Sequence, residues 1–276
     1  MLQKRATMIC LTFDVEERFH SHLTPGDATR EWNLRDRITI LLDYLEEHKK
    51  KATFFVVGEL AAEYPDLVRR MSAPNFEVAS HSYSHIWMDT ENRRQCRDDI
   101  SDSKKALEDI TGQPVYGFRA PSWSARISHD WLWDHLISLG FRYDASLFPF
   151  KTHMYGSFQN PVRPFRLHQQ LIEIPPSVFA PGIVRIPYGG GFYFRLYPSW
   201  LTLFFIGRNL AEEKIPVIYL HPWDFEANPH MLERTWLQRF IGNYNIEKTW
   251  SRFTDLMDDY ETITMSDFYR RLEPLL

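Results

Sequence analysis

A regular alternation of short apolar runs with longer helical patterns constrains the fold most strongly. Apolar runs of strand length occupy residues 8–13, 52–57, 76–79 and 116–118, and helical periodicity occupies residues 35–49, 59–71, 91–111 and 128–139. Such alternation is typical of a parallel sheet whose strands are joined by crossover helices. We therefore expect an α/β fold, with the sheet either open or closed into a barrel.

The pattern breaks in the middle of the chain. Residues 150–197 are rich in Pro, Gly and aromatic residues, which predicts a loop-rich insertion. Regularity then resumes with a helix at 198–210, a strand at 217–220, helical periodicity over 231–260, a strand at 262–264 and a last helix capped by Ser266. A chain of 276 residues that is 44% hydrophobic can bury one large core, so we expect a single domain over residues 1–276.

Charge and composition exclude several classes of partner. The net charge of −4 and the isoelectric point near 6.3 offer no basic surface to a nucleic acid. No apolar stretch approaches the length of about 18 residues that a transmembrane helix needs. The first residues resemble no signal peptide, so the sequence predicts a cytoplasmic protein without a transmembrane segment. It predicts no particular oligomeric state.

Acids and histidines with the spacing of a metal site follow the first and third apolar runs. Asp14 and Glu16 stand at the end of the first run, where α/β sheets place their chemistry. His81 and His85 are four residues apart, so their side chains can lie on one side of a helical turn or converge from a tight loop. Carboxylate and imidazole together suit Zn²⁺ or a neighbouring first-row metal. On spacing alone, surface histidines in a Ser-rich turn remain the alternative.

Four further clusters accompany predicted strands and helices in a fixed order. They are Thr53-Phe54-Phe55, Arg119-Ala120-Pro121, Tyr143-Asp144-Ala145-Ser146 and Leu220-His221-Pro222-Trp223. With the acids and histidines above, they make the sequence resemble the polysaccharide deacetylases of the NodB-homology group, and most closely the branch associated with bacterial exopolysaccharide and exosortase loci. The resemblance implies a distorted (β/α) barrel, with a motif-bearing core over about 6–225 and a C-terminal family-specific region over about 188–276.

The resemblance also implies a divalent metal, Zn²⁺ or else Co²⁺, Ni²⁺ or Fe²⁺, held by His81, His85 and one acid. The family's usual second aspartate is Val15 here, and valine cannot bind a metal. We infer that Glu16 takes its place, because a side chain two residues on from the first acid projects on the same side of a strand. Glu17 is the weaker alternative, since strand alternation would aim it away.

Four residues receive catalytic roles from the resemblance. Asp14 would be the general base, and Arg119 would pair with it and orient it. His221 would be the general acid that protonates the departing amine. Asp144 would hydrogen-bond His221 and keep it protonated, because a nearby carboxylate favours the charged imidazole.

Substrate contacts are expected from loops next to these motifs. The predicted substrate-binding residues are Tyr83, Pro121, Trp123, Trp223, Gly190 and Arg195. The backbone N–H of Tyr83 or a neighbour would hold the tetrahedral oxyanion. Aromatic side chains, including Trp87, Tyr188 and Phe192, would contact the sugar. The run of three glycines at 189–191 is interpreted as a turn that gives substrate access to the backbone.

These predictions converge on a metal-dependent hydrolase that removes N-acetyl groups from an amino sugar in a polysaccharide or its precursor. The implied partner is an N-acetylated saccharide. Two alternatives stay open. One is an allantoinase-like cyclic amidase of the same fold, and the other is a catalytically inactive carbohydrate-binding homologue, made credible by Val15.

Overall fold

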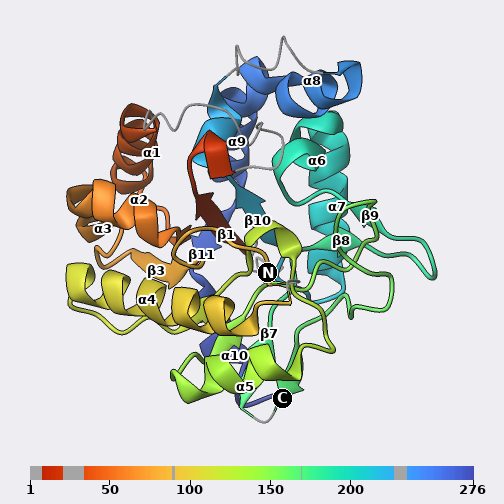
Figure 1. Cartoon of the computed structure of the whole chain (residues 1–276). Coiled ribbons are helices and arrows are strands. Elements are labelled where there is room, and N and C mark those ends of the chain that lie inside the picture. The colour runs from red at the N-terminus through yellow and green to blue at the C-terminus, as the bar shows by residue number, and fades with distance from the viewer. Residues whose placement is uncertain (1–7, 21–33, 89–90, 169, 227–234) are drawn as a thin grey trace.

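The structure is a computed structural model, and it describes residues 8–20, 34–88, 91–168, 170–226 and 235–276. In this part of the chain a nine-stranded sheet has the order β10-β1-β2-β3-β4-β5-β7-β6, and β11 also pairs with β1 (Figure 1). Its strands are β1 (Met8–Val15), β2 (Ala52–Val56), β3 (Phe76–Ser80), β4 (Gly117–Phe118), β5 (Tyr143–Asp144), β6 (Phe165–His168), β7 (Leu171–Glu173), β10 (Val217–Leu220) and β11 (Glu261–Ile263). The predicted parallel α/β sheet is therefore confirmed.

Helices surround this sheet. They are α1 (Arg35–Glu47), α2 (Gly58–Glu63), α3 (Pro65–Arg70), α4 (Arg93–Thr111), α5 (Asp130–Ser138), α6 (Gly191–Leu196), α7 (Ser199–Ala211), α8 (Trp236–Asn243), α9 (Thr249–Asp259) and α10 (Met265–Leu272). Figure 1 shows α1 to α4 on one flank of the central strands, and α6 and α7 on the other. None of the helices in the described ranges is both long and apolar enough to span a bilayer.

The sheet is a curved half-barrel. The pairings from β10 through β1, β2, β3, β4 and β5 to β7 are parallel, and β6 runs antiparallel to β7. The end strands β10 and β6 are not paired with each other in the described ladders, so the distorted barrel stays open. Because the paired strands are parallel, their carboxyl ends meet at one edge, and that edge carries the site described below.

Both faces of the central strand β1 are buried, which explains its continuous apolar sequence. Ile9, Leu11 and Phe13 belong to the main hydrophobic core. Cys10 belongs to a second core on the opposite face, together with Met265 of α10. A one-residue shift of β1 would therefore exchange these two faces, so packing fixes the register that carries the following acids.

Two boundaries differ from the sequence prediction for local reasons. The expected helix over 59–71 is split into α2 and α3, because Pro65 has no N–H to continue α2 and instead begins α3. The last helix begins at Met265, and Thr264 rather than Ser266 caps it by accepting a hydrogen bond from the Asp267 N–H at 3.0 Å.

The C-terminal part of the chain completes the sheet. β11 pairs with Met8–Cys10 of β1, and β10 pairs with Cys10–Phe13. The carboxylate of Glu77 on β3 also accepts hydrogen bonds from Thr53 Oγ1 (2.7 Å), the Tyr143 hydroxyl (2.7 Å) and the Ser266 N–H (2.8 Å). The family-specific region expected over 188–276 therefore contributes strands to the same sheet as the motif-bearing core.

The insertion contains more regular structure than expected. Besides β6 and β7, it holds the hairpin of β8 (Val178–Phe179) and β9 (Ile186–Pro187) and the short helix α6. The helical periodicity predicted over 231–260 corresponds to two helices, α8 and α9, while residues 231–234 lie outside the described residues.

Candidate active site

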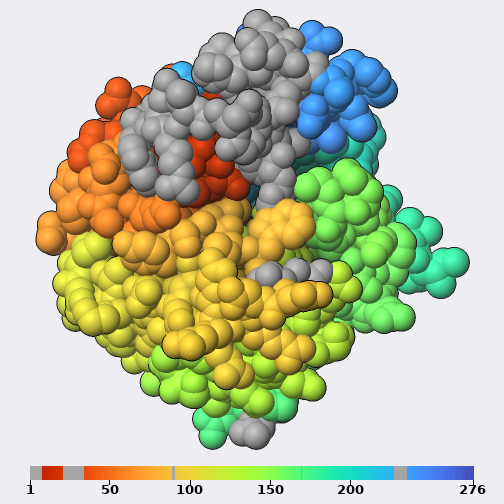
Figure 2. Space-filling view, in the orientation of Figure 1, coloured from red at the N-terminus to blue at the C-terminus, as the bar shows by residue number. Residues whose placement is uncertain are grey.

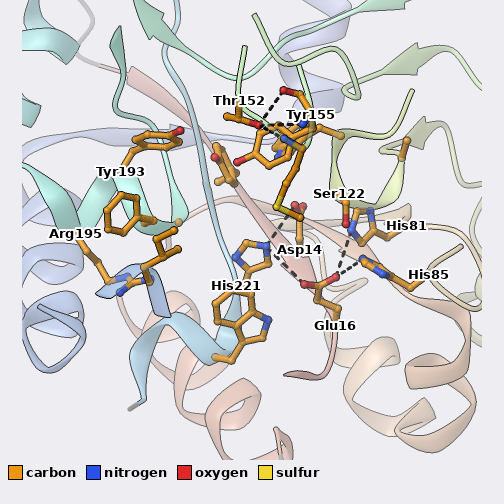
Figure 3. A pocket seen from close by; sticks show the side chains of 18 of the residues that line it. Asp14, Glu16, His81, His85, Ser122, Thr152, Tyr155, Tyr193, Arg195 and His221 are labelled. Atoms are coloured by element: carbon orange, nitrogen blue, oxygen red, sulfur yellow. Dashed lines mark hydrogen bonds and ion pairs between the residues drawn. The ribbon is translucent and has the colours of Figure 1, made fainter. Parts of the chain in front are cut away.

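A cavity of about 270 Å³ lies at the carboxyl ends of the central strands (Figure 3). Asp14 is the next-to-last residue of β1 and Glu16 directly follows that strand, while His81 and His221 directly follow β3 and β10. His85 also lines the cavity. Parallel pairing thus brings residues that are 200 positions apart in the sequence to one point, as the order of the strands predicts.

Glu16, His81 and His85 form a group whose potential ligand atoms all lie within 4.8 Å of one another. His81 Nδ1 donates a hydrogen bond to the carbonyl oxygen of Arg119 at 2.7 Å, which leaves its Nε2 lone pair facing the Glu16 carboxylate at 3.8 Å. His85 Nε2 contacts the same oxygen of Glu16. Glu17 points elsewhere, because its carboxylate accepts the Leu34 N–H at 3.0 Å.

The charge state of this group fits a divalent cation. Burial lowers the pKa of His81 to about 4, so its imidazole is neutral near pH 7, as a metal ligand must be. Burial would raise the pKa of Glu16, but the neighbouring His85, His221 and His81 imidazoles hold it well below its usual value. A buried carboxylate and two imidazole nitrogens make a donor set that suits Zn²⁺ or another first-row metal and leaves coordination positions open.

The loop that carries the histidines is held by Asp99 of α4. Its carboxylate accepts the N–H groups of Tyr83 (2.7 Å) and Ser84 (3.0 Å). Ser82 and His85 adopt positive φ angles of 64° and 57°, which this anchoring stabilises. The prediction that the Tyr83 N–H holds an oxyanion is therefore wrong, because that N–H already binds Asp99. No sequence signal connected Asp99 to this loop.

Asp14 is fixed by Arg119, as predicted. The fully buried guanidinium donates hydrogen bonds to Asp14 Oδ1 and to Thr12 Oγ1 (3.1 Å), and it lies over the ring of Phe55 at 3.9 Å. The second carboxylate oxygen, Oδ2, lies 3.9 Å from His221 Nε2. Arg119 therefore orients Asp14 and compensates its charge, with one carboxylate oxygen on the side of His221.

His221 is paired with Asp224, a residue that the sequence reading missed. Asp224 Oδ2 lies 3.0 Å from His221 Nδ1 and also accepts the His221 N–H at 3.0 Å, within the 3-10 turn η3 (Pro222–Phe225). Burial would lower the pKa of His221, but Asp224, with Glu16 and Asp14, raises it to about 9. Arg195 lies 3.4 Å from the other oxygen of Asp224.

The predicted contact between Asp144 and His221 is wrong. Asp144 accepts hydrogen bonds from the Ser146 N–H (3.0 Å) and hydroxyl (2.7 Å), and Ser146 Oγ accepts the Ala120 N–H (2.7 Å). β5, which carries Asp144, is separated from β10 by four strands in the sheet order. Burial raises the pKa of Asp144, and burial beside Asp144 raises the pKa of Glu173 well above its usual value. Asp144 thus supports the segment after Arg119.

The predicted substrate-binding residues divide into two groups. Trp123 and Trp223 line the cavity, and the ring of Trp223 stacks on His221 with centroids 4.2 Å apart. Pro121 is buried at the start of η2 (Pro121–Trp123) and is not among the described lining residues, whereas Ser122 is. Phe192 also lines the cavity.

Gly190 and Arg195 serve packing more than substrate access. A Cβ at Gly190 would meet the Tyr219 carbonyl oxygen at 1.9 Å, so the glycine permits close approach to β10, and Gly191 is the glycine that lines the cavity. Arg195 lines the cavity too, but it is 1% exposed and its guanidinium binds the carbonyl oxygens of Ile241 (3.0 Å) and other residues of that turn. Among the other expected aromatics, Tyr188 is buried in the core.

An aromatic wall borders the cavity, and of its residues the motifs predicted only Trp123. It comprises Trp123, Phe148 and Tyr219, with Phe150, Tyr155 and Tyr193 packed against them. The residues of this wall that line the cavity are Trp123, Tyr155, Tyr193 and Tyr219. The turn before Tyr155 is held by Thr152, whose hydroxyl oxygen accepts the N–H groups of Met154 (3.2 Å) and Tyr155 (2.9 Å) (Figure 3). The high content of aromatics after residue 147 was the available signal.

Two family models match consecutive parts of the chain. The model of the polysaccharide deacetylase family matches residues 2–143, and a domain of unknown function (DUF3473) matches residues 145–270. A peptidoglycan-N-acetylglucosamine deacetylase of Bacillus cereus is 32% identical over 81 residues, which are 29% of this chain and 30% of that protein. Other curated relatives are likewise matched over less than half of their length.

Solved structures share the fold. A Mycobacterium smegmatis protein assigned as a polysaccharide deacetylase superposes with a TM-score of 0.65 at 18% identity, covering 100% of this chain and 93% of that one. The allantoinase PuuE superposes with a TM-score of 0.64 at 14% identity, covering 99% of this chain and 92% of that one. At these identities the likeness shows a common fold.

Proposed function

The chain belongs to the polysaccharide deacetylase family, and on this premise we propose that it is a metal-dependent hydrolase that removes N-acetyl groups from an amino sugar. One observation carries the proposal. Asp14 and His221 lie in one cavity with Glu16, His81 and His85, so a base, an acid and a metal-ligand set surround the same space.

The residues suit amide hydrolysis. Glu16, His81 and His85 would hold a divalent ion, which would supply polarisation of the acetamide carbonyl and acidification of water. Asp14, oriented by Arg119, accepts one proton of the attacking water. The oxygen of that water bonds to the acyl carbon, and the electron pair of the carbonyl π bond moves to the acyl oxygen.

His221 then completes the reaction on the other side of the amide. The C–N bond breaks, its electron pair stays on nitrogen, and His221 Nε2 donates the proton that this nitrogen takes up. Asp224 binds Nδ1, which fixes the direction of Nε2 and favours the charged imidazole. Acetate and the free amine leave.

The two alternative functions make different demands on this cavity. An allantoinase-like cyclic amidase shares the fold, and metal-assisted attack on an amide carbon would serve it equally. An inactive homologue would be expected to lack a ligand, the base or the acid, whereas this chain retains all of them despite Val15. We therefore rank deacetylation first. The exopolysaccharide branch and the cytoplasmic location remain proposals, which genomic context and cell fractionation test.

The test is acetate release from N-acetylated mono- and oligosaccharides by the metal-free protein, and by the protein supplied with Zn²⁺, Co²⁺, Ni²⁺ or Fe²⁺. A cyclic ureide in the same panel addresses the amidase alternative. We expect metal-dependent acetate release and no ring opening. Ring opening without acetate release would replace the proposal by the amidase, and stoichiometric metal without any turnover would favour the binding protein.

A further inference from the structure

A second cavity of about 300 Å³ adjoins the first one. The two share Trp123, Met154 and Tyr155 in their linings, so these three side chains stand between them. The rest of the second lining comes from Trp87 and from residues within 124–128 and 151–160. Figure 2 shows the face on which the orange N-terminal half meets the green segment that follows residue 145.

The chemistry of the second cavity differs from that of the first. The reaction cavity contains two carboxylates, whereas the polar part of the second lining consists of hydroxyl, amide and basic residues, beside aromatic and aliphatic ones. Arg126 and Lys151 are its charged residues, and no Asp or Glu occurs among the described residues that line it. The whole chain carries 36 acidic against 32 basic side chains, so this lining departs from the average of the protein. Such a local positive field attracts anions.

The shape of this cavity is fixed by polar side chains that already have partners. Ser124 Oγ donates to the Pro121 carbonyl oxygen (2.6 Å) and accepts the Met88 N–H (2.9 Å). Asn160 Nδ2 donates to the Phe148 carbonyl oxygen (3.0 Å). Lys151, by contrast, is exposed, and none of the described carboxylates forms an ion pair with it.

The aromatic residue Trp87 also belongs to this lining. Trp87 is 39% exposed, although tryptophan is normally more deeply buried. A partly exposed indole beside hydroxyls and cations suits the ring of a sugar that carries a negative charge. Because the two cavities share three wall residues, a ligand of two linked parts would place one part in each cavity.

We propose that the second cavity binds an anionic group attached to the amino sugar, with Lys151 and Arg126 as its charge partners. This inference rests on the proposed deacetylase function. The anion has two possible sources: a phosphate or diphosphate on the anomeric carbon of the same sugar, or the carboxylate of an adjacent acidic sugar. Both present oxygen atoms that ammonium and guanidinium groups bind in the same way.

The experiment compares three substrates of metal-loaded protein at low and high ionic strength. They are N-acetylglucosamine 1-phosphate, a disaccharide of N-acetylglucosamine with glucuronic acid, and the neutral disaccharide of N-acetylglucosamine. The variants are Lys151→Ala, Lys151→Glu and Arg126→Ala. Lys105→Ala is the control, because Lys105 is an exposed lysine of α4 paired with Asp109 and lies outside both cavities.

We expect each alanine variant to raise KM for at least one anionic substrate about three- to tenfold, with kcat and the neutral substrate nearly unchanged. Lys151→Glu should have a larger effect, and high salt should reduce the difference. A loss confined to the sugar phosphate identifies a phosphate, and a loss confined to the glucuronic acid disaccharide identifies a carboxylate. Equal effects on all three substrates, or none, would overturn the inference.

Binding without turnover separates this inference from the proposed function. Calorimetric titration with N-acetylglucosamine 1-phosphate and with N-acetylglucosamine measures the anionic contribution directly. Suppose that no substrate releases acetate but wild-type protein binds N-acetylglucosamine 1-phosphate more tightly than Lys151→Ala does. The second cavity is then an anion site, and the deacetylase proposal fails. If acetate is released but the phosphate adds no affinity, the anionic site fails alone.

Discussion

The two sides of the active site are built by different parts of the chain and are fixed in different ways. On the N-terminal side, Asp14, Glu16 and His81 stand at the ends of β1 and β3, and the pairing of both strands with β2 sets their positions. On the C-terminal side, β10 positions His221, but the direction of its imidazole depends on Asp224 and Arg195. Strand register therefore places Asp14, Glu16 and His81, which Arg119 and Asp99 then hold in position. The direction of the His221 ring, by contrast, depends on charged side chains of its own region.

The boundary between the two matched families falls between these sides. The polysaccharide deacetylase model ends at residue 143, and the second model begins at residue 145. The ligands and the base come from the first region, and the acid and most of the aromatic wall come from the second. Under the proposed function, the region without an assigned function would supply the proton donor and most of the aromatic wall, and the deacetylase region would supply the metal ligands and the base.

The largest effect should come from the metal side. His81→Ala or His85→Ala removes one of three ligands, so we expect stoichiometric metal and all measurable acetate release to be lost. Elemental analysis and an acetate assay measure these. His153→Ala is the control, because His153 lines the cavity outside the ligand group. Metal that survives loss of both histidines would refute the assignment.

The second largest effect should come from replacing Asp14, the proposed general base. Asp14→Asn keeps the shape and can still accept a hydrogen bond from Arg119, but it cannot accept a proton. We expect bound metal to be retained and kcat to fall about 10²- to 10⁴-fold. Metal content and steady-state kinetics on the same preparation check this. A rate near that of the wild type would place the base elsewhere.

The third effect concerns His221 and is measured in the pH dependence of the rate. The pKa of His221 is raised to about 9, so the charged form is lost, and the rate falls, as pH rises through that value. Asp224→Asn removes the nearest negative charge, which lowers this pKa toward the ordinary value of about 6.5, so the alkaline limb should move to lower pH.

Asp144→Asn is the matched comparison for that shift. Its carboxylate binds Ser146 rather than His221, so the alkaline limb should stay in place. If the alkaline limb moved in Asp144→Asn but not in Asp224→Asn, Asp144 rather than Asp224 would be the carboxylate that acts on His221.

The smallest effect concerns packing on the C-terminal side. Gly190→Ala places a Cβ at 1.9 Å from the Tyr219 carbonyl oxygen, and the shift needed should lower the free energy of unfolding by about 1–3 kcal/mol. Gly207→Ala in α7 meets nothing within 4 Å, so it should raise that free energy by about 0.5–1 kcal/mol. Chemical denaturation measures both. If Gly190→Ala and Gly207→Ala changed the free energy of unfolding equally, the contact of Gly190 with Tyr219 of β10 would not be tight.

Sequence reasoning succeeded where a residue's place follows from a strand. Asp14, His81, Arg119 and His221 each end or directly follow an apolar run, and parallel strands bring such positions together. The choice of Glu16 over Glu17 followed from strand alternation, and the structure places Glu16 beside the histidines.

Sequence reasoning failed where a place depends on which side chains pack together. Asp224 binds His221 within a 3-10 turn, and a spacing of three residues is too common to single it out. Asp99 lies on α4 and binds the Tyr83 N–H in the loop that precedes this helix, and no local pattern in the sequence links the two residues. The Tyr83 N–H and Gly190 had plausible chemical roles, but their actual neighbours, Asp99 and Tyr219, became visible only in three dimensions.

The pairing of β1 with both β10 and β11 has a consequence for synthesis of the protein. The strand that carries Asp14 is synthesised before two of its partners, which follow it in the chain by about 200 residues or more. Contacts this distant in sequence form late and slowly. During translation, β1 therefore keeps an unpaired edge until β10 and β11 have been made, and His221 joins the other residues of the cavity only after β10 has paired.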